Sequence, residues 1–311
     1  MSAALVLGER GSGLTTFVGL LYTAQVRLGT DESDEFRFHA ERESIRQLET
    51  IYGELGAGRF PTHDANWEDR PLSFVFGFRQ GKLRGLAHRE TEPDTGFDTV
   101  EVQVSGMLTD VAAELRDNDA VLDPSTRRSL RSQVVVPLID ASSLAPPPRN
   151  GDPLPVSDRD RLLAGTLDLL GKFLAAEPDR KARRLFPLFV VTKSDRVQLE
   201  TLRRLDAPSG IPAEWTPEAR RALGGRLLRT YFPETSKFLE SHERGSGLVV
   251  AAPEWYFSGL GTEATGGELR IQRRSRAPVG GWEPVYPFDE YRALIETLGK
   301  IAHRLPSDSA G

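Results

Sequence analysis

Glycines and a hydroxyl near the N-terminus have the spacing of a phosphate-binding turn. Within residues 5–17, Gly8 and Gly13 take the glycine positions of the pattern G-x-x-x-x-G-K-[ST], and Thr15 takes the hydroxyl position. Glycines let the backbone turn so that successive N–H groups point at phosphate oxygens. A helix that begins near Leu14 adds the positive end of its dipole. The alternative is a glycine-rich strand-to-helix turn without a ligand. The predicted phosphate ligands are Gly8, Gly11, Ser12, Gly13, Leu14, Thr15 and Thr16.

The position that this pattern gives to lysine holds Leu14. A lysine there would neutralise charge on the terminal phosphates, and charge stabilisation dominates the catalysis of phosphoryl transfer. We therefore expect weaker triphosphate binding and a larger loss of turnover. Arg10 lies inside the same turn, where it either supplies compensating charge or points to solvent. The Thr15 hydroxyl is suitably placed to ligate Mg²⁺.

A second candidate group follows an apolar run late in the chain. Residues 185–191 have the composition of a buried strand, and Thr192-Lys193-Ser194-Asp195 comes directly after them. A carboxylate at the C-terminal end of a parallel strand can accept hydrogen bonds from N1 and the 2-amino group of guanine. The lysine stem can lie over the purine face. This segment therefore predicts a base-binding role for Thr192, Lys193 and Asp195, and the alternative is the start of an ordinary helix.

Further candidates lie in loops between these two motifs. Thr62 follows a predicted helix, and a threonine there can close on the terminal phosphate and Mg²⁺ in a nucleotide switch. It is otherwise an ordinary loop residue. Glu90, Glu92 and Asp94 follow a predicted strand, where a carboxylate can hold Mg²⁺ through water. A solvated acidic turn is the alternative for this acidic segment.

The composition excludes several classes of site. The chain has 311 residues, a net charge of -5 and no cysteine. The negative charge gives no electrostatic case for nucleic acid as a partner. Disulfides, cysteine-ligated zinc and thiol catalysis are excluded, and the histidines show no metal-ligand spacing. No apolar run is long enough to span a membrane, and the first residues have the pattern of a core strand rather than a signal peptide, so we expect a cytoplasmic protein.

Hydrophobic periodicity predicts the elements that must position these residues. Pro137 should create a bulge or an edge position in its strand, and Ser157 should cap the helix that follows it. Backbone N–H groups of Ala251 and Ala252, after the last core strand, could meet a base carbonyl. Helices are expected over residues 14–28, 41–55, 100–115, 158–176, 198–205, 217–228, 234–241 and 288–305. Strands are expected over residues 3–7, 72–78, 83–88, 133–140, 185–191, 247–252 and 268–274.

This order of elements, with the turn at residues 8–15 and the Thr-Lys-Ser-Asp segment, resembles the Ras-like domain of the P-loop GTPases. Thr192 to Asp195 is similar to that family's [NT]-K-x-D guanine-specificity motif. Within the group, the chain looks most like bacterial double-GTPase type domains, which share a Gly-Ser-Gly-x-Thr-Thr loop followed by an aromatic residue, as in residues 11–17. Residues 58–62 are similar to their switch segment but have one residue fewer between proline and threonine. The D-x-x-G segment of the family is absent or degraded.

The resemblance implies an α/β, three-layer P-loop NTPase fold. It implies a six-stranded, mostly parallel sheet with one antiparallel edge strand, helices on both faces, and a GTP or GDP site with Mg²⁺ at the strand C-termini. We expect a single domain over residues 1–305 and a disordered tail over 306–311. Insertions at about 31–68, 201–246 and 258–287 are where a protein partner would bind.

The retained base-binding motif and the changed phosphate side together predict a guanine-nucleotide-binding protein that is impaired in hydrolysis. Such a protein would act as a switch or scaffold for a protein partner. One alternative is a competent GTPase in which Arg10 or a partner replaces the lysine. Another is an interaction domain that binds no nucleotide. An ATPase or a kinase would make Thr192 to Asp195 a coincidence.

Overall fold

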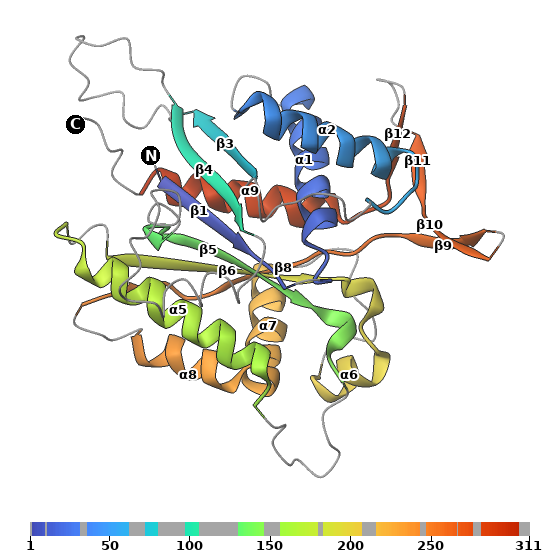
Figure 1. The fold of residues 1–311 in the computed structure, drawn as a ribbon. Coiled ribbons are helices and arrows are strands. Elements are labelled where there is room, and N and C mark those ends of the chain that lie inside the picture. Colours follow the sequence, from blue (N-terminus) through green and yellow to red (C-terminus); the bar gives the residue numbers. More distant parts are fainter. Residues whose placement is uncertain are drawn as a thin grey trace, which may run out of the picture.

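A central sheet with helices on both faces organises the chain (Figure 1). Its strands are hydrogen-bonded in the order β2-β3-β4-β1-β5-β6-β7, and β8 also pairs with β6. The strands are β1 Ser2–Leu7, β2 Phe36–Ala40, β3 Leu72–Arg79, β4 Phe97–Ser105, β5 Val134–Asp140, β6 Arg184–Thr192, β7 Val249–Val250 and β8 Glu254–Phe257. The computed structural model describes residues 2–9, 11–31, 36–61, 72–79, 97–105, 130–145, 156–179, 183–206, 216–242, 247–265, 267–275 and 281–304.

The expected α/β class with a mostly parallel sheet is confirmed, but the sheet differs in detail. Among the described residues it has eight strands rather than six. β3 is the antiparallel strand, and it lies between β2 and β4 instead of at an edge. The additional strand β2 falls in a segment whose polar composition predicted an insertion. Phe38 anchors it, because its ring packs against Tyr22, Phe74 and Phe76.

Alternating residues of the strands build one core on each face of the sheet. In β1, Ala4 and Val6 belong to one core, and Leu5 and Leu7 belong to the other. Helices α1, α2 and α9 cover the first core, while α5, α7 and α8 cover the second (Figure 1). The helices are α1 Leu14–Asp31, α2 Arg42–Gly56, α5 Asp158–Ala176, α6 Leu199–Arg204, α7 Pro217–Tyr231, α8 Pro233–His242 and α9 Phe288–Ala302.

Most of the expected helices are confirmed, and the one expected over residues 100–115 is wrong in the part that the structure describes. α5 has the expected bounds, and the Ser157 hydroxyl accepts a hydrogen bond from Asp160 N at 3.1 Å as its N-cap. Residues 100–105, expected to be helical, belong to β4, which pairs with β3 over its whole length. β4 therefore takes the place of the predicted return strand at residues 83–88, a segment outside the described residues. The helix was expected from apolar residues with helical spacing, and this outweighed the alternation of the valines in β4; these residues are Val104, Met107, Leu108, Val111 and Leu115.

Pro137 does not produce the expected bulge or edge position. It lies in β5, which is central because β1 and β6 pair with it on either side. Val135 pairs with Pro187 and Leu138 with Val190, so the offset between the strands stays the same across the proline. Proline lacks an N–H donor, and pairing with β6 is therefore interrupted at this point without any change in register.

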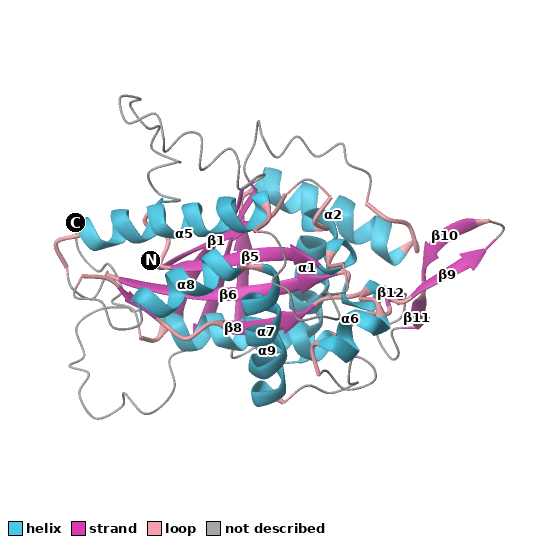
Figure 2. Cartoon of the chain, turned by 90° about the horizontal axis from the view of Figure 1, so that it is seen from below, coloured by secondary structure: helices cyan, strands magenta, loops and turns pink. Residues whose placement is uncertain are grey.

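Two small ribbons extend beyond the sheet near the C-terminal end of the chain. β9 Thr262–Thr265 pairs with β10 Glu268–Ile271, and β11 Arg273–Ser275 pairs with β12 Trp282–Pro284, both antiparallel. Figure 2 shows the β9–β10 hairpin projecting away from the body of the molecule. One strand of these ribbons was expected at residues 268–274, whereas β9 and β12 are short and were missed. None of the helices in the described ranges is long and apolar enough to cross a membrane.

Candidate functional site

The turn between β1 and α1 has the backbone geometry that the glycine spacing predicted. Ser12 N donates to Glu9 O at 2.9 Å, and Phe17 N donates to Gly13 O at 2.8 Å, which starts α1. Gly11 and Gly13 have φ angles of 82° and 84°. A side chain is strained in this left-handed region, so glycine is required where the chain reverses into the helix.

This turn lies at the edge of the sheet where the parallel strands end. Leu7 ends β1, Thr192 ends β6 and Phe257 ends β8, all at the same edge because these strands run parallel. After β1 the chain enters α1 on one face, and after β5 it continues to α5 on the other. Such a reversal of the connections opens a crevice at the carboxyl ends of the strands, which is where open α/β sheets bind ligands.

The Thr192–Asp195 segment contacts the turn directly. The Thr192 hydroxyl donates to Ser12 O at 2.5 Å, and Lys193 Nζ donates to Gly11 O at 2.6 Å. Lys193 adopts a left-handed conformation, with φ 51° and ψ 36°. This strained conformation turns the chain sharply after β6, and the lysine stem then lies beside the glycine turn. The structure thus brings together the two motifs that the sequence indicated.

Asp140 is a further member of the site that the sequence analysis missed. Lys193 Nζ lies 2.7 Å from Asp140 Oδ2, and Ser142 N and its hydroxyl donate to Asp140 Oδ1. Burial acts to raise the pKa of Asp140, but the hydrogen bonds from Lys193 and Ser142 outweigh it, and the pKa lies below its ordinary value. Its position at the end of a buried strand, like that of Thr192, was the signal that could have identified it.

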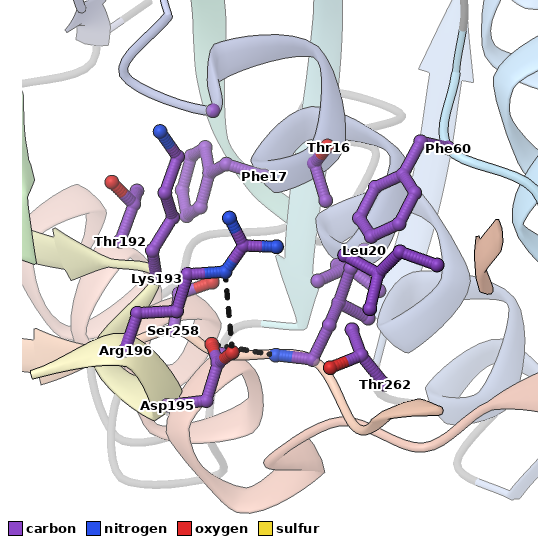
Figure 3. Close-up of a pocket in the computed structure, with 14 residues that line it drawn as sticks. Thr16, Phe17, Leu20, Phe60, Thr192, Lys193, Asp195, Arg196, Ser258 and Thr262 are labelled. Atoms are coloured by element: carbon purple, nitrogen blue, oxygen red, sulfur yellow. Dashed lines mark hydrogen bonds and ion pairs between the residues drawn. The ribbon is translucent and has the colours of Figure 1, made fainter. Parts of the chain in front are cut away.

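A cavity of about 280 Å³ opens between the turn, the end of β6 and the loop after β8 (Figure 3). Asp195 lies at its floor, where Oδ1 accepts a hydrogen bond from Leu260 N at 3.2 Å. Phe60 and Leu20 lie on the side opposite Lys193, together with Thr16 and Thr262 (Figure 3). The lining residues are Gly13, Thr16, Phe17, Leu20, Phe60, Thr192, Lys193, Asp195, Arg196, Ser258, Gly259, Leu260, Thr262 and Leu269.

The loop at the cavity after the last strand is Ser258 to Leu260 rather than Ala251 and Ala252. The predicted strand at residues 247–252 is only partly present, since β7 is short and the chain pairs with β6 again as β8. Ala251 N donates to Leu185 O, near the opposite end of β6, so the structure does not bring Ala251 or Ala252 to the cavity. The sequence analysis placed the end of the strand one segment too early.

Helix α9 packs against the Ser258–Leu260 loop through Tyr291. The Ser258 side chain and the Tyr291 hydroxyl share a hydrogen bond of 2.5 Å, and Tyr291 stacks on Phe17 with ring centroids 5.7 Å apart. Burial raises the pKa of Tyr291, which keeps its hydroxyl protonated. A Cβ at Gly259 would lie 2.9 Å from Asp195 Oδ1, so this backbone can approach the carboxylate only because residue 259 is glycine.

Leu14, at the lysine position of the motif, belongs to the apolar core beneath α1 and is 8% exposed. Thr15 and Thr16 follow it in the first turn of α1, and Thr16 lines the cavity. The Ser12 hydroxyl is buried without a hydrogen-bond partner among the described residues. On the outer side of the turn, Arg159 pairs with Glu9 at 2.7 Å.

Other candidates of the sequence analysis fall outside the described residues. These are Arg10, Thr62, Glu90, Glu92 and Asp94. Of the proposed Mg²⁺ ligands, only Thr15 is described. Within the described ranges, no three histidine, aspartate or glutamate side chains gather as a metal site would require.

Comparison with known proteins gives little further information. No family model and no curated protein matches this sequence. Among solved structures, the chain is similar to one described as the signal recognition particle receptor SRb-GTP/SRX complex from Chaetomium thermophilum. The identity is 15%, the TM-score is 0.35, and the match covers 83% of this chain and 90% of the other. A likeness this weak carries no conclusion about function.

Proposed function

We propose that this chain binds a guanine nucleotide, GDP or GTP, in the cavity beside the Gly8–Thr16 turn. We further propose that it hydrolyses the nucleotide poorly and acts as a switch or scaffold for a protein partner. The observation that carries the proposal is the hydrogen bond of 2.6 Å from Lys193 Nζ to Gly11 O, between residues 182 positions apart. It joins the turn that we propose binds phosphate to the segment that we propose binds the base.

The chemistry of the cavity supports a purine ligand at one end and phosphates at the other. Asp195 offers carboxylate oxygens that suit the N1 and 2-amino donors of guanine. The Lys193 stem and the apolar side chains opposite, such as Phe60, could enclose a flat ring. Gly11 to Thr15, at the start of α1, could offer backbone N–H groups and the positive end of a helix dipole to phosphate.

Impaired hydrolysis is supported by Leu14, which occupies the lysine position of the motif. Leu14 is buried and apolar, so it cannot neutralise a phosphate. Lys193 does not replace it, because its ammonium group already binds Gly11 O and Asp140. We propose Thr15 as a ligand of Mg²⁺, which would bridge phosphate oxygens when bound. Thr62 and Glu90 remain proposed ligands from the sequence alone.

A protein partner is proposed from the segments that exceed a minimal domain. We take residues 1–305 as one domain, with about 31–68, 201–246 and 258–287 as insertions. The last of these includes the β9–β10 and β11–β12 ribbons, on which Leu269 and Trp282 are 51% and 57% exposed. Large apolar side chains exposed on a projecting ribbon are typical of interaction sites.

Calorimetric titration of GDP and GTP, with and without Mg²⁺, tests the proposal. We expect weak binding that ATP does not compete away, and tighter binding to Leu14→Lys because the new ammonium group can reach the phosphates. Leu14→Met is the matched control, since it keeps a long apolar side chain and should leave the affinity unchanged. Both variants are first checked for an unchanged circular dichroism spectrum, because residue 14 is buried.

The result separates the proposal from its alternatives. Binding without turnover supports an impaired site, whereas turnover at an ordinary rate would indicate a competent GTPase that obtains charge from Arg10 or from a partner. If neither the wild-type chain nor Leu14→Lys binds a guanine nucleotide, the proposal is wrong. The chain would then be an interaction domain with a nucleotide-binding shape.

A further inference from the structure

The charged side chains that line the cavity differ in how many hydrogen bonds they already make within the protein. Lys193, Asp195 and Arg196 are the charged residues of its described lining. Lys193 Nζ already donates to Gly11 O at 2.6 Å and to Asp140 Oδ2 at 2.7 Å. Asp195 uses Oδ1 for Leu260 N at 3.2 Å, which leaves Oδ2 as an acceptor that faces the cavity. Asp195 and Arg196 therefore retain capacity for a ligand.

Arg196 lies next to that free carboxylate oxygen without a hydrogen bond to it. Its Nε is 3.9 Å from Asp195 Oδ2, beyond hydrogen-bonding distance, and its side chain is 43% exposed. Figure 3 shows the guanidinium extending into the cavity between Lys193 and Thr16. Within the described part of the chain, no other carboxylate or carbonyl pairs with this guanidinium. The guanidinium of Arg196, a donor, and Oδ2 of Asp195, an acceptor, thus lie side by side at one end of the cavity.

This pairing matches adjoining edges of guanine. Guanine carries its donors, N1–H and the 2-amino group, beside the acceptors O6 and N7, and arginine commonly binds O6 and N7 together. Resting on the proposed nucleotide site, we propose that Arg196 binds the O6/N7 edge of guanine while Asp195 binds the N1/N2 edge. Arg196 is then a specificity-determining residue of the site.

Two other donors of the cavity lining are already used. The Thr192 hydroxyl donates its proton to Ser12 O at 2.5 Å, and Leu260 N donates to Asp195. Arg196 directly follows Asp195 in the short helix η3 (Ser194–Arg196). The backbone of this helix is fixed by a hydrogen bond of 2.8 Å from Arg196 N to Lys193 O. The Arg196 Nε lies 3.9 Å from the carboxylate that we propose binds the base, which places it at the base end of the proposed site.

Calorimetric titration with three diphosphates tests this assignment. GDP has the complete base, 7-deaza-GDP lacks the N7 acceptor, and inosine diphosphate lacks the 2-amino group. The variant is Arg196→Met, which keeps a long side chain and removes the donors. Arg161→Met is the matched control, since Arg161 is an arginine on α5, 60% exposed, and does not line the cavity. Thermal unfolding of both variants verifies that they fold as the wild type does.

We expect wild-type protein to bind GDP roughly tenfold more tightly than 7-deaza-GDP, the effect of one charge-assisted hydrogen bond. In Arg196→Met the affinity should fall roughly a hundredfold for GDP, which loses the contacts to O6 and N7, and roughly tenfold for 7-deaza-GDP, which loses only the contact to O6. The preference for GDP over 7-deaza-GDP should then disappear. The preference over inosine diphosphate should persist, because Asp195 is unchanged. Arg161→Met should behave as the wild type.

The contrary outcomes are distinct. If Arg196→Met keeps the preference for GDP over 7-deaza-GDP, Arg196 does not bind this edge, although the proposed function stands. An equal loss of affinity for both ligands would place the arginine at the phosphates or ribose and would also overturn the assignment. If the wild-type chain binds none of the three diphosphates, the proposed function itself is wrong, and this assignment is lost with it.

Discussion

At the scale of single residues, a lysine contacts the glycine turn, but it is not at the position that the motif gives to lysine. It comes from the end of β6. Leu14 is buried, and the ammonium group beside Gly11 belongs to Lys193. Lys193 also pairs with Asp140, whose side chain is only 14% exposed. These contacts tie the turn to the ends of β5 and β6. We therefore expect Lys193 to stabilise this part of the fold in addition to any role toward a ligand.

Lys193→Met should destabilise the chain in a pH-dependent way. At pH 7 the free energy of unfolding should fall by about 1–3 kcal/mol, since the substitution leaves a partly buried carboxylate without its main donor. The pKa of Asp140 in the folded chain lies below its ordinary value. Its stabilising contribution is therefore present above the unfolded pKa of about 3.9 and is lost as the pH falls through the folded pKa. Urea unfolding of the wild type and of Lys193→Met between pH 3 and pH 7 measures the difference in their free energies of unfolding.

Lys172→Met is the control for this experiment. Lys172 lies 2.7 Å from Asp168, the same distance as in the Lys193 pair, but the two side chains are 69% and 45% exposed. The loss should be below about 1 kcal/mol and should depend little on pH. The Lys193–Asp140 pair would contribute nothing to stability if Lys193→Met lowered the free energy of unfolding as little as Lys172→Met does. The same conclusion would follow if the difference between Lys193→Met and the wild type did not become smaller below about pH 4.

The sequence identified much of this site because the two motifs are local patterns. The turn and the Thr192–Asp195 segment each follow an apolar strand, so their positions at one sheet edge could be expected. The end of a buried strand marks Asp140 as a candidate, but its pairing with Lys193 could not be identified in the same way, and neither could the position of Ser258. Their roles depend on which strand pairs with which and on how far each strand continues, and those are long-range properties that no local pattern contains.

At the scale of elements, one carboxylate joins α7, β8 and α9. Glu290 of α9 accepts from Arg220 of α7 at 2.8 Å through Oε1, and from Phe257 N of β8 at 2.9 Å through Oε2. The side chains of Arg220 and Glu290 are 12% and 6% exposed. Since β8 lies beside β6 at the edge of the sheet, Glu290 covers a backbone donor that would otherwise be open. This junction holds the strand that leads into the Ser258–Leu260 loop.

Removing one side of this ion pair should be costly. Arg220→Ala should lower the free energy of unfolding by about 3–5 kcal/mol, because it leaves the Glu290 carboxylate buried and unpaired. The double variant Arg220→Ala/Glu290→Gln should recover a large part of the lost free energy of unfolding, since the glutamine amide oxygen can still accept from Phe257 N without carrying charge. Thermal or urea unfolding of the single and double variants measures both effects.

The neighbouring residue on the same helix provides the control. Arg221 pairs with Glu254 at 2.7 Å, and the side chains are 51% and 32% exposed. Arg221→Ala should cost less than about 1 kcal/mol. Similar losses for Arg220→Ala and Arg221→Ala would mean that burial of the Glu290 pair has no special effect on stability.

Elements with strong local signals were predicted well, and elements that depend on their partners were not. α5 was predicted with its bounds because a serine cap and an apolar stripe both indicate it. The end of β4 was taken for a helix because apolar residues from Val104 to Leu115 have helical spacing, although the valines within β4 alternate as in a strand. The short ribbon strands, of three or four residues, contain too few positions for any periodicity.

At the scale of the whole molecule, the site draws on both cores and on both ends of the chain. The turn leads into α1, whose Phe17 stacks on Tyr291 of α9 in the first core. Phe257, which leads into the Ser258–Leu260 loop, belongs to the second core. A ligand that contacts the turn, Asp195 and this loop therefore needs all of these parts folded together.

Binding of GDP should accordingly stabilise the chain as one unit. A ligand at one hundred times its dissociation constant raises the free energy of unfolding by about 2.7 kcal/mol, provided that it binds only the folded state. Far-UV circular dichroism reports the helices of both cores. Tryptophan fluorescence includes Trp255, which is 1% exposed in the second core. We expect the urea transitions from both probes to coincide and to shift equally with GDP, whereas ADP at the same concentration should shift neither. A GDP shift confined to one probe would show that the two cores unfold separately, and the single domain proposed for residues 1–305 would then be wrong.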